Sequence, residues 1–485
     1  MSRKFGSSVR RINLIDVGLN KMVISLWDHQ RELYDAVRLE MARGYKRILV
    51  RAETGFGKTR LAGAMIEAAL SKGLKAGFVV PRKELRRQTS ESFTDLGVSH
   101  SSIASGMHYN PFADAYICTA GTLHTKLDRL EPSIVFIDEA HFGNAQIGKI
   151  IDYYADKGCW IIGLTATPKK MDGTPLAQWF DVMVQGKDMR WLIDHGYLSD
   201  YRLFQPSMPD LSGVKFDKNK GDYNGAQLKK RMEQDRKIIG DAVKHYRDLA
   251  MGRLNMAFTT SVKHSNILAE GFRSAGIPAV HMDGDTKEAD RKKIARAFAK
   301  REILVLCTVD LCLFGYDLAS AAGMPATVEC LSDLRPTGSL PLQMQKWGRG
   351  LRKKKDDCII LDHAGNSFHK NGQRNHGFPC DEREWSLLGE TINHTGEKGV
   401  ATKQCEKCFF VYAPAKECPN CGHVNATQER EVTMEDGTLQ EIKRDSRREQ
   451  EDVYNYYYKK AVEQGFKNPS LFAKNAVLAK KKGSL

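Results

Sequence analysis

The chain has 485 residues, of which 41% are hydrophobic, and carries a formal net charge of +15. This length is too great for one ordinary hydrophobic core, and the apolar content excludes a disordered chain, so we expect about three folded domains. The surplus of lysine and arginine predicts a polyanionic partner. Because no apolar run approaches a membrane span of about eighteen residues, we expect a cytoplasmic protein with no membrane partner.

The first clear pattern follows a basic N-terminal arm, residues 1–21. Leu26 to Gln30 reads L-W-D-H-Q and opens a predicted helix that runs to about Arg43. The amide of Gln30 lies shortly before a glycine-rich stretch and could read the edge of an adenine. The alternative is a glutamine that faces solvent. This helix begins the first predicted domain, residues 22–195.

The glycine-rich stretch is a candidate phosphate-binding loop. A predicted strand at 47–52 leads into E-T-G-F-G-K-T and then into an apolar helix. Backbone N–H groups at Gly55 and Gly57 can curl around phosphates, Lys58 can reach the terminal phosphates, and the Thr59 hydroxyl can hold Mg²⁺. The full pattern has a glycine where this chain has alanine. The alternative is an ordinary glycine-rich turn.

Two further predicted strands end in residues suited to a nucleic-acid backbone. The strand at 76–80 is followed by the basic turn that begins at Pro81 and Arg82. The strand at 116–119 is followed by small residues around Thr122, whose backbone amides could approach phosphate. The alternative for the basic turn is a solvated run of charge.

The next strand carries two acids at its end. Ile134 to Ile137 forms a continuous apolar run, typical of a buried parallel strand, and Asp138 and Glu139 follow at once. Ligands bind at the carboxyl ends of such strands. With Lys58 and Thr59 these carboxylates predict a magnesium-ATP hydrolysis centre. A further strand leads into T-A-T at 165–167, and the alternation of strands and helices predicts a doubly wound domain.

A second α/β domain is predicted at 236–375, after a connector at 196–235. It ends with Q-M-Q-K-W-G-R-G-L-R, in which Arg349 and Arg352 lie three apart and hence on one helical face. Both could point at the same anion, as arginine fingers do when the partner domain binds ATP. The alternative is a pair of surface arginines.

These motifs, in this order, resemble the superfamily 2 helicases of the D-E-A-H type over about residues 22–375. The resemblance extends to phage and bacterial DNA repair and branch-migration helicases with a C-terminal zinc ribbon. It implies two tandem RecA-like domains, each a parallel sheet with helices on both faces, with ATP in the cleft and nucleic acid across both.

The resemblance assigns a role to each matching residue. It makes Asp138 the metal-linked carboxylate, Glu139 the base that orients water, and Asp317 a nucleotide-side residue. It implies that Gln30 reads adenine and that Gln345, Arg349 and Arg352 form the family's last motif. The residues that would contact nucleic-acid phosphates are Pro81, Arg82, Thr122 and Thr308. Where many relatives have glutamate, this chain has Phe314. The resemblance therefore does not assign the coupling contact that this glutamate makes.

Four of the eleven cysteines form two C-x-x-C pairs within residues 400–425. Four thiolates at this spacing can surround Zn²⁺ tetrahedrally, and a site filled by sulfur is structural. The predicted ligands of this zinc ribbon are Cys405, Cys408, Cys418 and Cys421. The other cysteines are scattered, which indicates a reducing compartment.

The last predicted segment is a basic helical tail, residues 445–485. It carries four tyrosines, at 454 and 456–458, beside Lys459 and Lys460, and aromatic residues together with lysines can stack bases and follow phosphates. The alternative is an amphipathic helix that packs on the rest of the chain.

Together these features predict an ATP-dependent DNA helicase or translocase that remodels branched DNA in replication, recombination or repair. We expect a monomer that binds DNA at single-strand/duplex junctions, in the host cytoplasm if a phage encodes it. The alternatives are an RNA helicase and an ATP-gated nucleic-acid-binding protein without catalysis. Intact Lys58, Glu139, Arg349 and Arg352 argue against the last one.

Overall fold

The computed structural model describes residues 24–170, 172–205, 208–217, 221–310, 316–368, 375–388, 403–412, 415–424, 458–460 and 462. The chain divides into two units, residues 1–425 and 426–485, and the described residues of the second unit are helical. The expected N-terminal arm, Phe314 and most of the predicted basic tail lie outside the described residues. No helix in the described part of the chain has the length and apolarity that a membrane crossing requires.

The first lobe is built on a seven-stranded parallel sheet of order β3-β4-β2-β5-β6-β1-β7. Its central strands are short apolar runs whose side chains are buried on both faces, as a doubly covered parallel sheet requires. The strands are β1 (Arg47–Arg51), β2 (Ala76–Val80), β3 (Ser101–Ile103), β4 (Ala115–Thr119), β5 (Ile134–Ile137), β6 (Trp160–Thr165) and β7 (Val182–Gln185).

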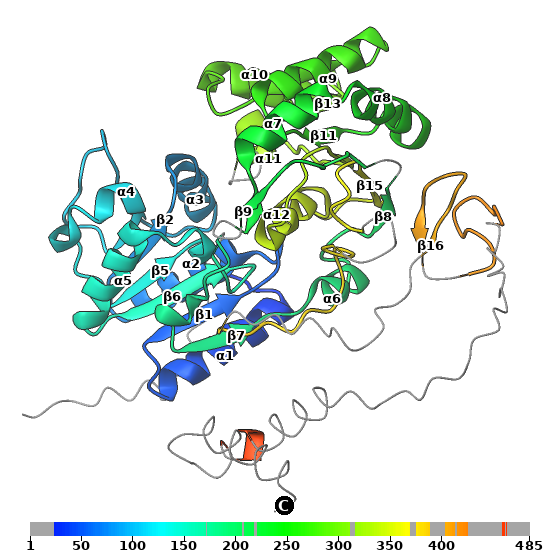
Figure 1. The fold of residues 1–485 in the computed structure, drawn as a ribbon. Coiled ribbons are helices and arrows are strands. Elements are labelled where there is room, and N and C mark those ends of the chain that lie inside the picture. Colours follow the sequence, from blue (N-terminus) through cyan, green and yellow to red (C-terminus); the bar gives the residue numbers. More distant parts are fainter. Residues whose placement is uncertain are drawn as a thin grey trace, which may run out of the picture. The chain divides into compact units, whose positions relative to one another are not determined.

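Helices cover both faces of this sheet (Figure 1). One apolar cluster joins one face to α1, α2 and α3, and another joins the opposite face to α4 and α5. The helices are α1 (Asp28–Ala42), α2 (Lys58–Leu70), α3 (Lys83–Asp95), α4 (Ala120–Leu123), α5 (Ala145–Asp156) and α6 (Met189–Asp194), with 3₁₀ turns η1 (Leu127–Arg129), η2 (Ala140–Phe142) and η3 (Leu176–Gln178).

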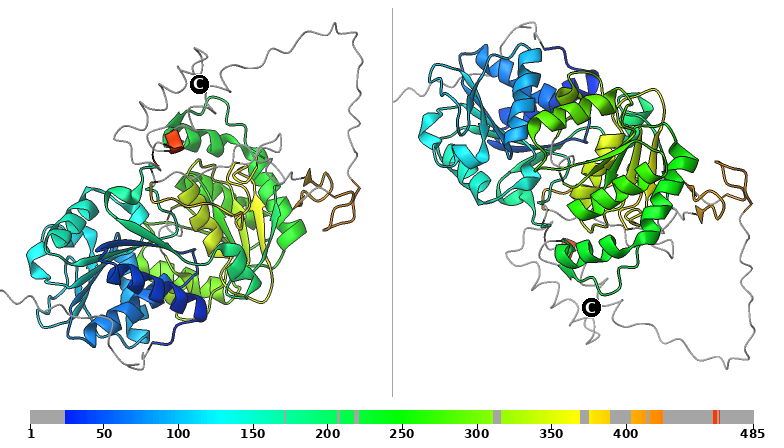
Figure 2. Two further views of the ribbon diagram at one scale, coloured as in Figure 1. Left: turned by 90° about the horizontal axis from the view of Figure 1, so that it is seen from below. Right: turned by 90° about the horizontal axis from the view of Figure 1, so that it is seen from above.

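The second lobe is built on a six-stranded parallel sheet of order β12-β13-β11-β14-β15-β8. Helices α10, α11 and α12 cover one face and α7, α8 and α9 cover the other (Figure 2). Its strands are β8 (Tyr201–Phe204), β11 (Asn255–Phe258), β12 (Ala279–Met282), β13 (Val305–Thr308), β14 (Cys330–Asp333) and β15 (Cys358–Asp362). Its helices are α7 (Gly225–Gln234), α8 (Arg236–Ala250), α9 (Val262–Ser274), α10 (Glu288–Ala299), α11 (Leu318–Ala322) and α12 (Leu340–Gly350).

The predicted fold class, parallel sheets with helices on both faces, is confirmed. The remaining strands form two small antiparallel pairs, β9 (Phe216–Asp217) with β10 (Asp222–Tyr223) and β16 (Lys403–Gln404) with β17 (Val411–Tyr412). The range predicted as a connector, 196–235, also contains β8 and α7, and β8 pairs with β15. That pairing joins segments far apart in the sequence, so local composition does not reveal it.

A buried ion pair fixes α12 to the end of β14. Lys346 Nζ lies 2.7 and 2.9 Å from the two carboxylate oxygens of Asp333 and donates to the Arg335 carbonyl at 2.8 Å. Gln343 and Asn366 also donate to Asp333, at 3.1 and 2.9 Å. Because both charges are buried and fully hydrogen-bonded, removing one of them leaves the other without compensation.

We therefore expect Lys346→Met to lower the free energy of unfolding by about 3–5 kcal/mol. The matched control is Lys244→Met, which removes an exposed lysine from an i,i+4 pair with Asp248 and should cost only about 0.3–0.5 kcal/mol. Urea denaturation of the full chain measures both. Equal losses in the two variants would contradict the role assigned to the buried pair.

Candidate functional site

The phosphate-loop sequence adopts the backbone that its glycines permit. Gly55 and Gly57 have φ of 86° and 90°, and Gly57 caps the start of α2. A Cβ on Gly57 would lie 2.3 Å from the Gln30 amide nitrogen. The loop therefore requires glycine at this position for its φ and for the close approach of Gln30.

Gln30 holds the loop in place. The fully buried side chain donates from Nε2 to the Phe56 carbonyl at 2.9 Å and accepts from the Trp27 N–H at 3.2 Å. Both ends of the amide are thus bonded to backbone. Trp27, which the sequence analysis did not single out, is 47% exposed beside Gly57, with the Arg60 guanidinium 6.0 Å from its ring. The sequence signal for its place beside the loop is its position three residues before Gln30.

Lys58 and Thr59 occupy the first turn of α2, directly after the loop. Lys58 Nζ donates to the carbonyls of Ala52 and Glu53 at 3.1 and 3.2 Å. These partners are neutral, so the ammonium charge remains available to an anion above the loop. Thr59 is partly buried, at the second position of the same helix.

Asp138 and Glu139 follow β5, as the sequence predicts for the end of a strand. Asp138 is 8% exposed and its Oδ1 accepts from the Glu139 N–H at 3.0 Å. Burial and the neighbouring Glu139 charge raise the pKa of Asp138 to about 7, against the opposing effect of Lys58. The phosphate-loop lysine is therefore within electrostatic reach of this carboxylate. Glu139 has φ of 48°, an uncommon conformation for a residue with a side chain and one that recurs at functional sites.

His141 links this acidic motif to T-A-T at the end of β6. Its Nδ1 lies 3.3 Å from Glu139 Oε2 and 3.2 Å from Thr165 Oγ1. Thr165 Oγ1 donates to the Thr167 carbonyl at 2.8 Å and so accepts from His141. Because burial lowers the pKa of His141, the ring is neutral at pH 7. His141 therefore lies beside both Glu139 and the T-A-T turn.

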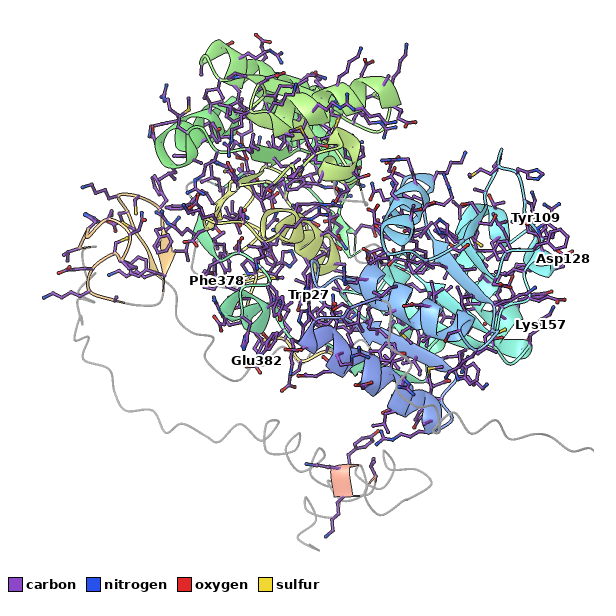
Figure 3. The ribbon with its side chains drawn as sticks, turned by 180° about the vertical axis from the view of Figure 1, so that it is seen from behind. Trp27, Tyr109, Asp128, Lys157, Phe378 and Glu382 are labelled. Atoms are coloured by element: carbon purple, nitrogen blue, oxygen red, sulfur yellow. The ribbon has the colours of Figure 1, made fainter. Side chains whose placement is uncertain are left out.

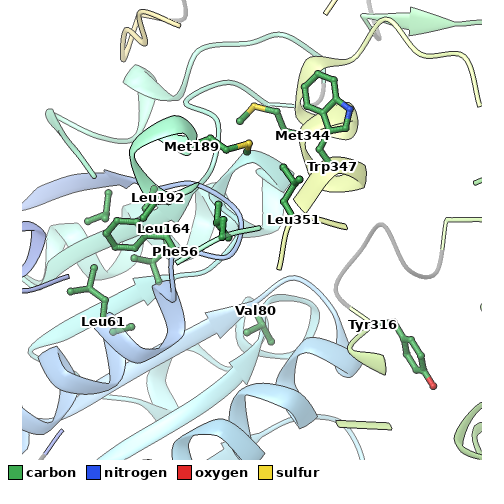
Figure 4. Close-up of a cluster of buried hydrophobic side chains, with 14 of the residues drawn as sticks. Phe56, Leu61, Val80, Leu164, Met189, Leu192, Tyr316, Met344, Trp347 and Leu351 are labelled. Atoms are coloured by element: carbon green, nitrogen blue, oxygen red, sulfur yellow. The ribbon is translucent and has the colours of Figure 1, made fainter. Parts of the chain in front are cut away.

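Helix α12 of the second lobe rests directly on the phosphate loop of the first. Thr54 Oγ1 donates to the Met344 carbonyl at 3.4 Å, and a Cβ on Gly348 would lie 2.4 Å from Thr54 Cβ. Figure 4 shows Met344 and Trp347 of this helix in one apolar cluster with Phe56 of the loop. The glycine of G-R-G is thus required by the contact between lobes.

The two candidate arginine fingers are engaged within their own lobe. The prediction that they share one helical face is wrong, because α12 ends at Gly350 and Arg352 lies beyond the helix, where it forms an isolated bridge with Leu198. Arg349 donates to the Tyr316 carbonyl at 3.0 Å, and Arg352 pairs with Asp317 at 2.5 Å. Burial opposes ionisation of Asp317, but Arg352 and other partners, Arg349 among them, outweigh it and hold the pKa of Asp317 below its ordinary value. Gln345, on the same helix, is 7% exposed.

The predicted nucleic-acid residues differ in their exposure. Pro81 is partly buried, whereas Arg82 is exposed and lies 6.0 Å from the ring of Phe142, directly after D-E-A-H. Thr122 is partly buried and its hydroxyl accepts from Thr119 at 3.0 Å. Thr308 is fully buried at the end of β13. In this conformation a phosphate can reach Arg82 but not the Thr308 side chain.

The four predicted zinc-ligand cysteines come together near the C-terminal end of the first unit. Their sulfur atoms, from Cys405, Cys408, Cys418 and Cys421, all lie within 4.8 Å of one another. Two of the sulfur pairs are 3.6 Å apart, close to the separation of about 3.8 Å that tetrahedral Zn–S bonds of about 2.3 Å impose. This separation is too long for a disulfide, and all four are free cysteines.

The cysteine cluster lies against the edge strand of the second sheet. Phe410 forms an isolated antiparallel bridge with Phe204 of β8, and the two rings are 5.3 Å apart. Gln404 donates to the Gln205 carbonyl, and Arg202 donates to Asn420. The cluster is thus attached to the lobe that carries α12.

Comparison with known proteins places these features in a family. Residues 23–170 match the family "Type III restriction enzyme, res subunit". The chain is 31% identical over 388 residues to the "51.5 kDa protein" of Lactococcus phage (isolate 7-9), covering 79% of each chain. It is 27% identical over 369 residues to "Putative ATP-dependent helicase IRC3" of Saccharomyces cerevisiae, covering 70% of this chain and 52% of that protein.

A solved structure supports the fold. The "ATP-dependent Type ISP restriction-modification enzyme LlaBIII bound to DNA" aligns with a TM-score of 0.51 and 15% identity, over 72% of this chain and 28% of that one. At this identity the likeness concerns the fold alone. The chain belongs to the family of the phage 51.5 kDa protein, carries a ResIII helicase domain, and has superfamily 2 helicases among its relatives.

Proposed function

We propose that the protein is a nucleic-acid-dependent ATPase that acts as a helicase or translocase on DNA. One observation carries this proposal: Lys58 and the Asp138–Glu139 pair lie within electrostatic reach of each other, while an arginine-bearing helix of the second lobe rests on the same loop. ATP hydrolysis needs a cation at the phosphates, a carboxylate beside water and a second cation for the developing charge. The relatives named as a helicase and as a DNA-bound enzyme support this choice.

Each group would act on ATP through its own chemistry. Gly55, Gly57 and Lys58 would hold the phosphates, and Thr59 and Asp138 would hold Mg²⁺, which neutralises phosphate charge when bound. Glu139, whose side chain is 17% exposed, would orient the attacking water and receive its proton. Gln30 would support the loop through its bonds to Phe56 and Trp27, and it would read the adenine edge only after a local rearrangement, because its side chain is fully buried.

Arg349 and Arg352 would act only after a conformational step. Their present partners are Tyr316 and Asp317 of the second lobe, so either guanidinium must exchange these contacts for the phosphates. Nucleic acid that bridges the lobes, at Arg82 on one side and near Thr308 on the other, would drive this exchange. Hydrolysis is then coupled to nucleic-acid binding.

The substrate we propose is branched DNA with a junction between single strand and duplex, handled during replication, recombination or repair. The motor would comprise residues 22–195 and 236–375, and the cysteine cluster would hold one structural Zn²⁺ and grip the neighbouring duplex. The net charge of +15 supports a polyanionic substrate. RNA as the substrate is the second candidate, because phosphate contacts alone do not separate the two.

Glu139→Gln is expected to retain ATP binding and to lower the nucleic-acid-stimulated rate by about 10²-fold or more, because the water loses its base. The measurement is ATP hydrolysis with forked DNA, single-stranded DNA, duplex DNA and RNA, with forked DNA expected to stimulate most. The control is Glu131→Gln, an exposed acid before the opposite end of β5. A Glu139→Gln protein with the wild-type rate would refute the assigned base, and equal rates with all four polymers would refute the substrate.

Arg349→Ala and Arg352→Ala are each expected to lower the turnover number by about 10²-fold while changing ATP affinity little, because the arginines reach the phosphates only in the closed state. Fluorescent-nucleotide titration and steady-state hydrolysis separate the two quantities. Arg247→Ala, an exposed arginine of α8, serves as the control. Loss of affinity in proportion to turnover would contradict this mechanism.

The wild-type chain is expected to contain about one zinc, since four convergent thiolates form a closed structural site. Metal analysis of the purified protein should show its loss in Cys418→Ser and its retention in Cys159→Ser, which changes a buried cysteine of the first lobe. ATP hydrolysis should persist in Cys418→Ser, with a weaker preference for forked DNA. Full zinc content in Cys418→Ser would refute the four-cysteine site.

A further inference from the structure

A segment that follows the second sheet returns to the first lobe. We call residues 375–388, N-H-G-F-P-C-D-E-R-E-W-S-L-L, the crossing segment. The segment lies outside the sequence motifs of the ATP site and the cysteine cluster. In Figure 3 its residues Phe378 and Glu382 lie at the lower margin of the second lobe, far from Tyr109 and Lys157 at the distant end of the first lobe.

The first half of the crossing segment is fixed to the second lobe. His376 Nε2 donates to the Thr337 carbonyl at 2.8 Å, and the ring of Phe378 packs 4.9 Å from that of Phe368. Tyr201 of β8 hydrogen-bonds to the Cys380 sulfur at 2.8 Å.

Arg383 organises the middle of the crossing segment. Its guanidinium donates to four carbonyls of the segment itself, at 2.8 to 3.1 Å, and lies 5.8 Å from the ring of Trp347 in α12. Burial lowers the pKa of Arg383, whereas Asp381 and Glu53 raise it. Glu53 belongs to the phosphate-loop sequence, so the segment is already within electrostatic reach of the first lobe.

The last part of the crossing segment bonds to the first lobe. The Ala177 N–H donates to the Leu387 carbonyl at 3.2 Å, and Gln185 of β7 donates to the Trp385 carbonyl at 3.5 Å. The Leu387 side chain packs against the apolar cluster beneath α5. The segment therefore spans from α12 to the edge of the first sheet.

Trp385, near the end of the crossing segment, lies against a buried arginine of the first lobe. Its ring lies 4.8 Å from the guanidinium of Arg51, the last residue of β1. Arg51 pairs with Glu53 and donates from Nε to the Ala166 carbonyl at 3.1 Å. One guanidinium therefore ties the start of the phosphate loop to the T-A-T turn, and Trp385 covers it.

The geometry points to the crossing segment as a positioning element of the ATPase, in which Trp385 holds Arg51 in place and Arg51 fixes the phosphate loop against the T-A-T turn. Because Arg383 and Trp347 anchor the segment beside α12, a movement of the second lobe would be transmitted to the phosphate loop through Trp385. Trp385 and Arg51 are positioning residues and touch no substrate atom. This inference rests on the proposed ATPase function and adds the route by which the second lobe acts on the loop.

The first test compares Trp385→Ala, Trp385→Phe and Leu388→Ala, the last an exposed neighbour on the same segment. Trp385→Ala should lower the nucleic-acid-stimulated turnover about tenfold, since a desolvated cation–π contact is lost, with ATP affinity changed less than twofold. Trp385→Phe should restore most of the rate, because it keeps an aromatic face, and Leu388→Ala should match wild type. Full activity in Trp385→Ala, or an equal loss in Leu388→Ala, would overturn the inference.

The second test asks whether Trp385 acts through Arg51. Arg51→Lys keeps a cation beside Glu53 but removes the planar guanidinium. If the two residues act as one unit, the double variant with Trp385→Ala should be no slower than the slower single variant. If the rate losses of the two single variants multiply in the double variant, the residues act independently, and the proposed route through Arg51 is wrong.

A third measurement needs neither nucleotide nor activity. Hydrogen–deuterium exchange of the backbone amides at 52–58 should be faster in Trp385→Ala than in wild type and unchanged in Leu388→Ala. Unchanged exchange in Trp385→Ala would overturn the inference. If the wild-type chain hydrolyses no ATP, the proposed function is wrong. The exchange data would still show whether Trp385 stabilises the phosphate loop.

Discussion

The close approach of α12 to the phosphate loop is the constraint on which the arrangement of both lobes depends. Gly348 meets Thr54 with no room for a side chain, and the same helix carries Gln345 and Arg349, while Arg352 follows just after its end. The buried Lys346–Asp333 pair fixes the orientation of this helix on the second sheet. The buried polar network at the end of β14 therefore holds the helix whose residues are proposed to act on ATP between the lobes.

The two sheets use their carboxyl edges in different ways. In the first lobe this edge carries Asp138, which accepts from the Glu139 N–H and lies within electrostatic reach of Lys58. In the second lobe Asp333 and Asp362 end neighbouring strands and accept hydrogen bonds from the lobe's own residues. The acids of the second edge are therefore engaged by the lobe's own residues, and they stiffen the support beneath α12.

The sequence predicts those features that short stretches encode. The strand at 134–137 with its two acids, the glycines of the phosphate loop and the cysteine spacing each depend on neighbouring residues, and the structure places them as expected. Long-range pairing does not show in such patterns. The clamp formed by Gln30 on Phe56 and the pairing of Arg352 with Asp317 become visible only when the distant partners are brought together.

The attachment of the cysteine cluster to β8 has a consequence for solubility. A strand at the border of a sheet presents unpaired N–H and C=O groups that can recruit a second chain. Phe410 covers part of this border through its bridge to Phe204, and Gln404 occupies the neighbouring Gln205 carbonyl. A chain that loses this cover would expose the border of β8 to other copies of itself, so we expect such a chain to be more prone to edge-to-edge pairing.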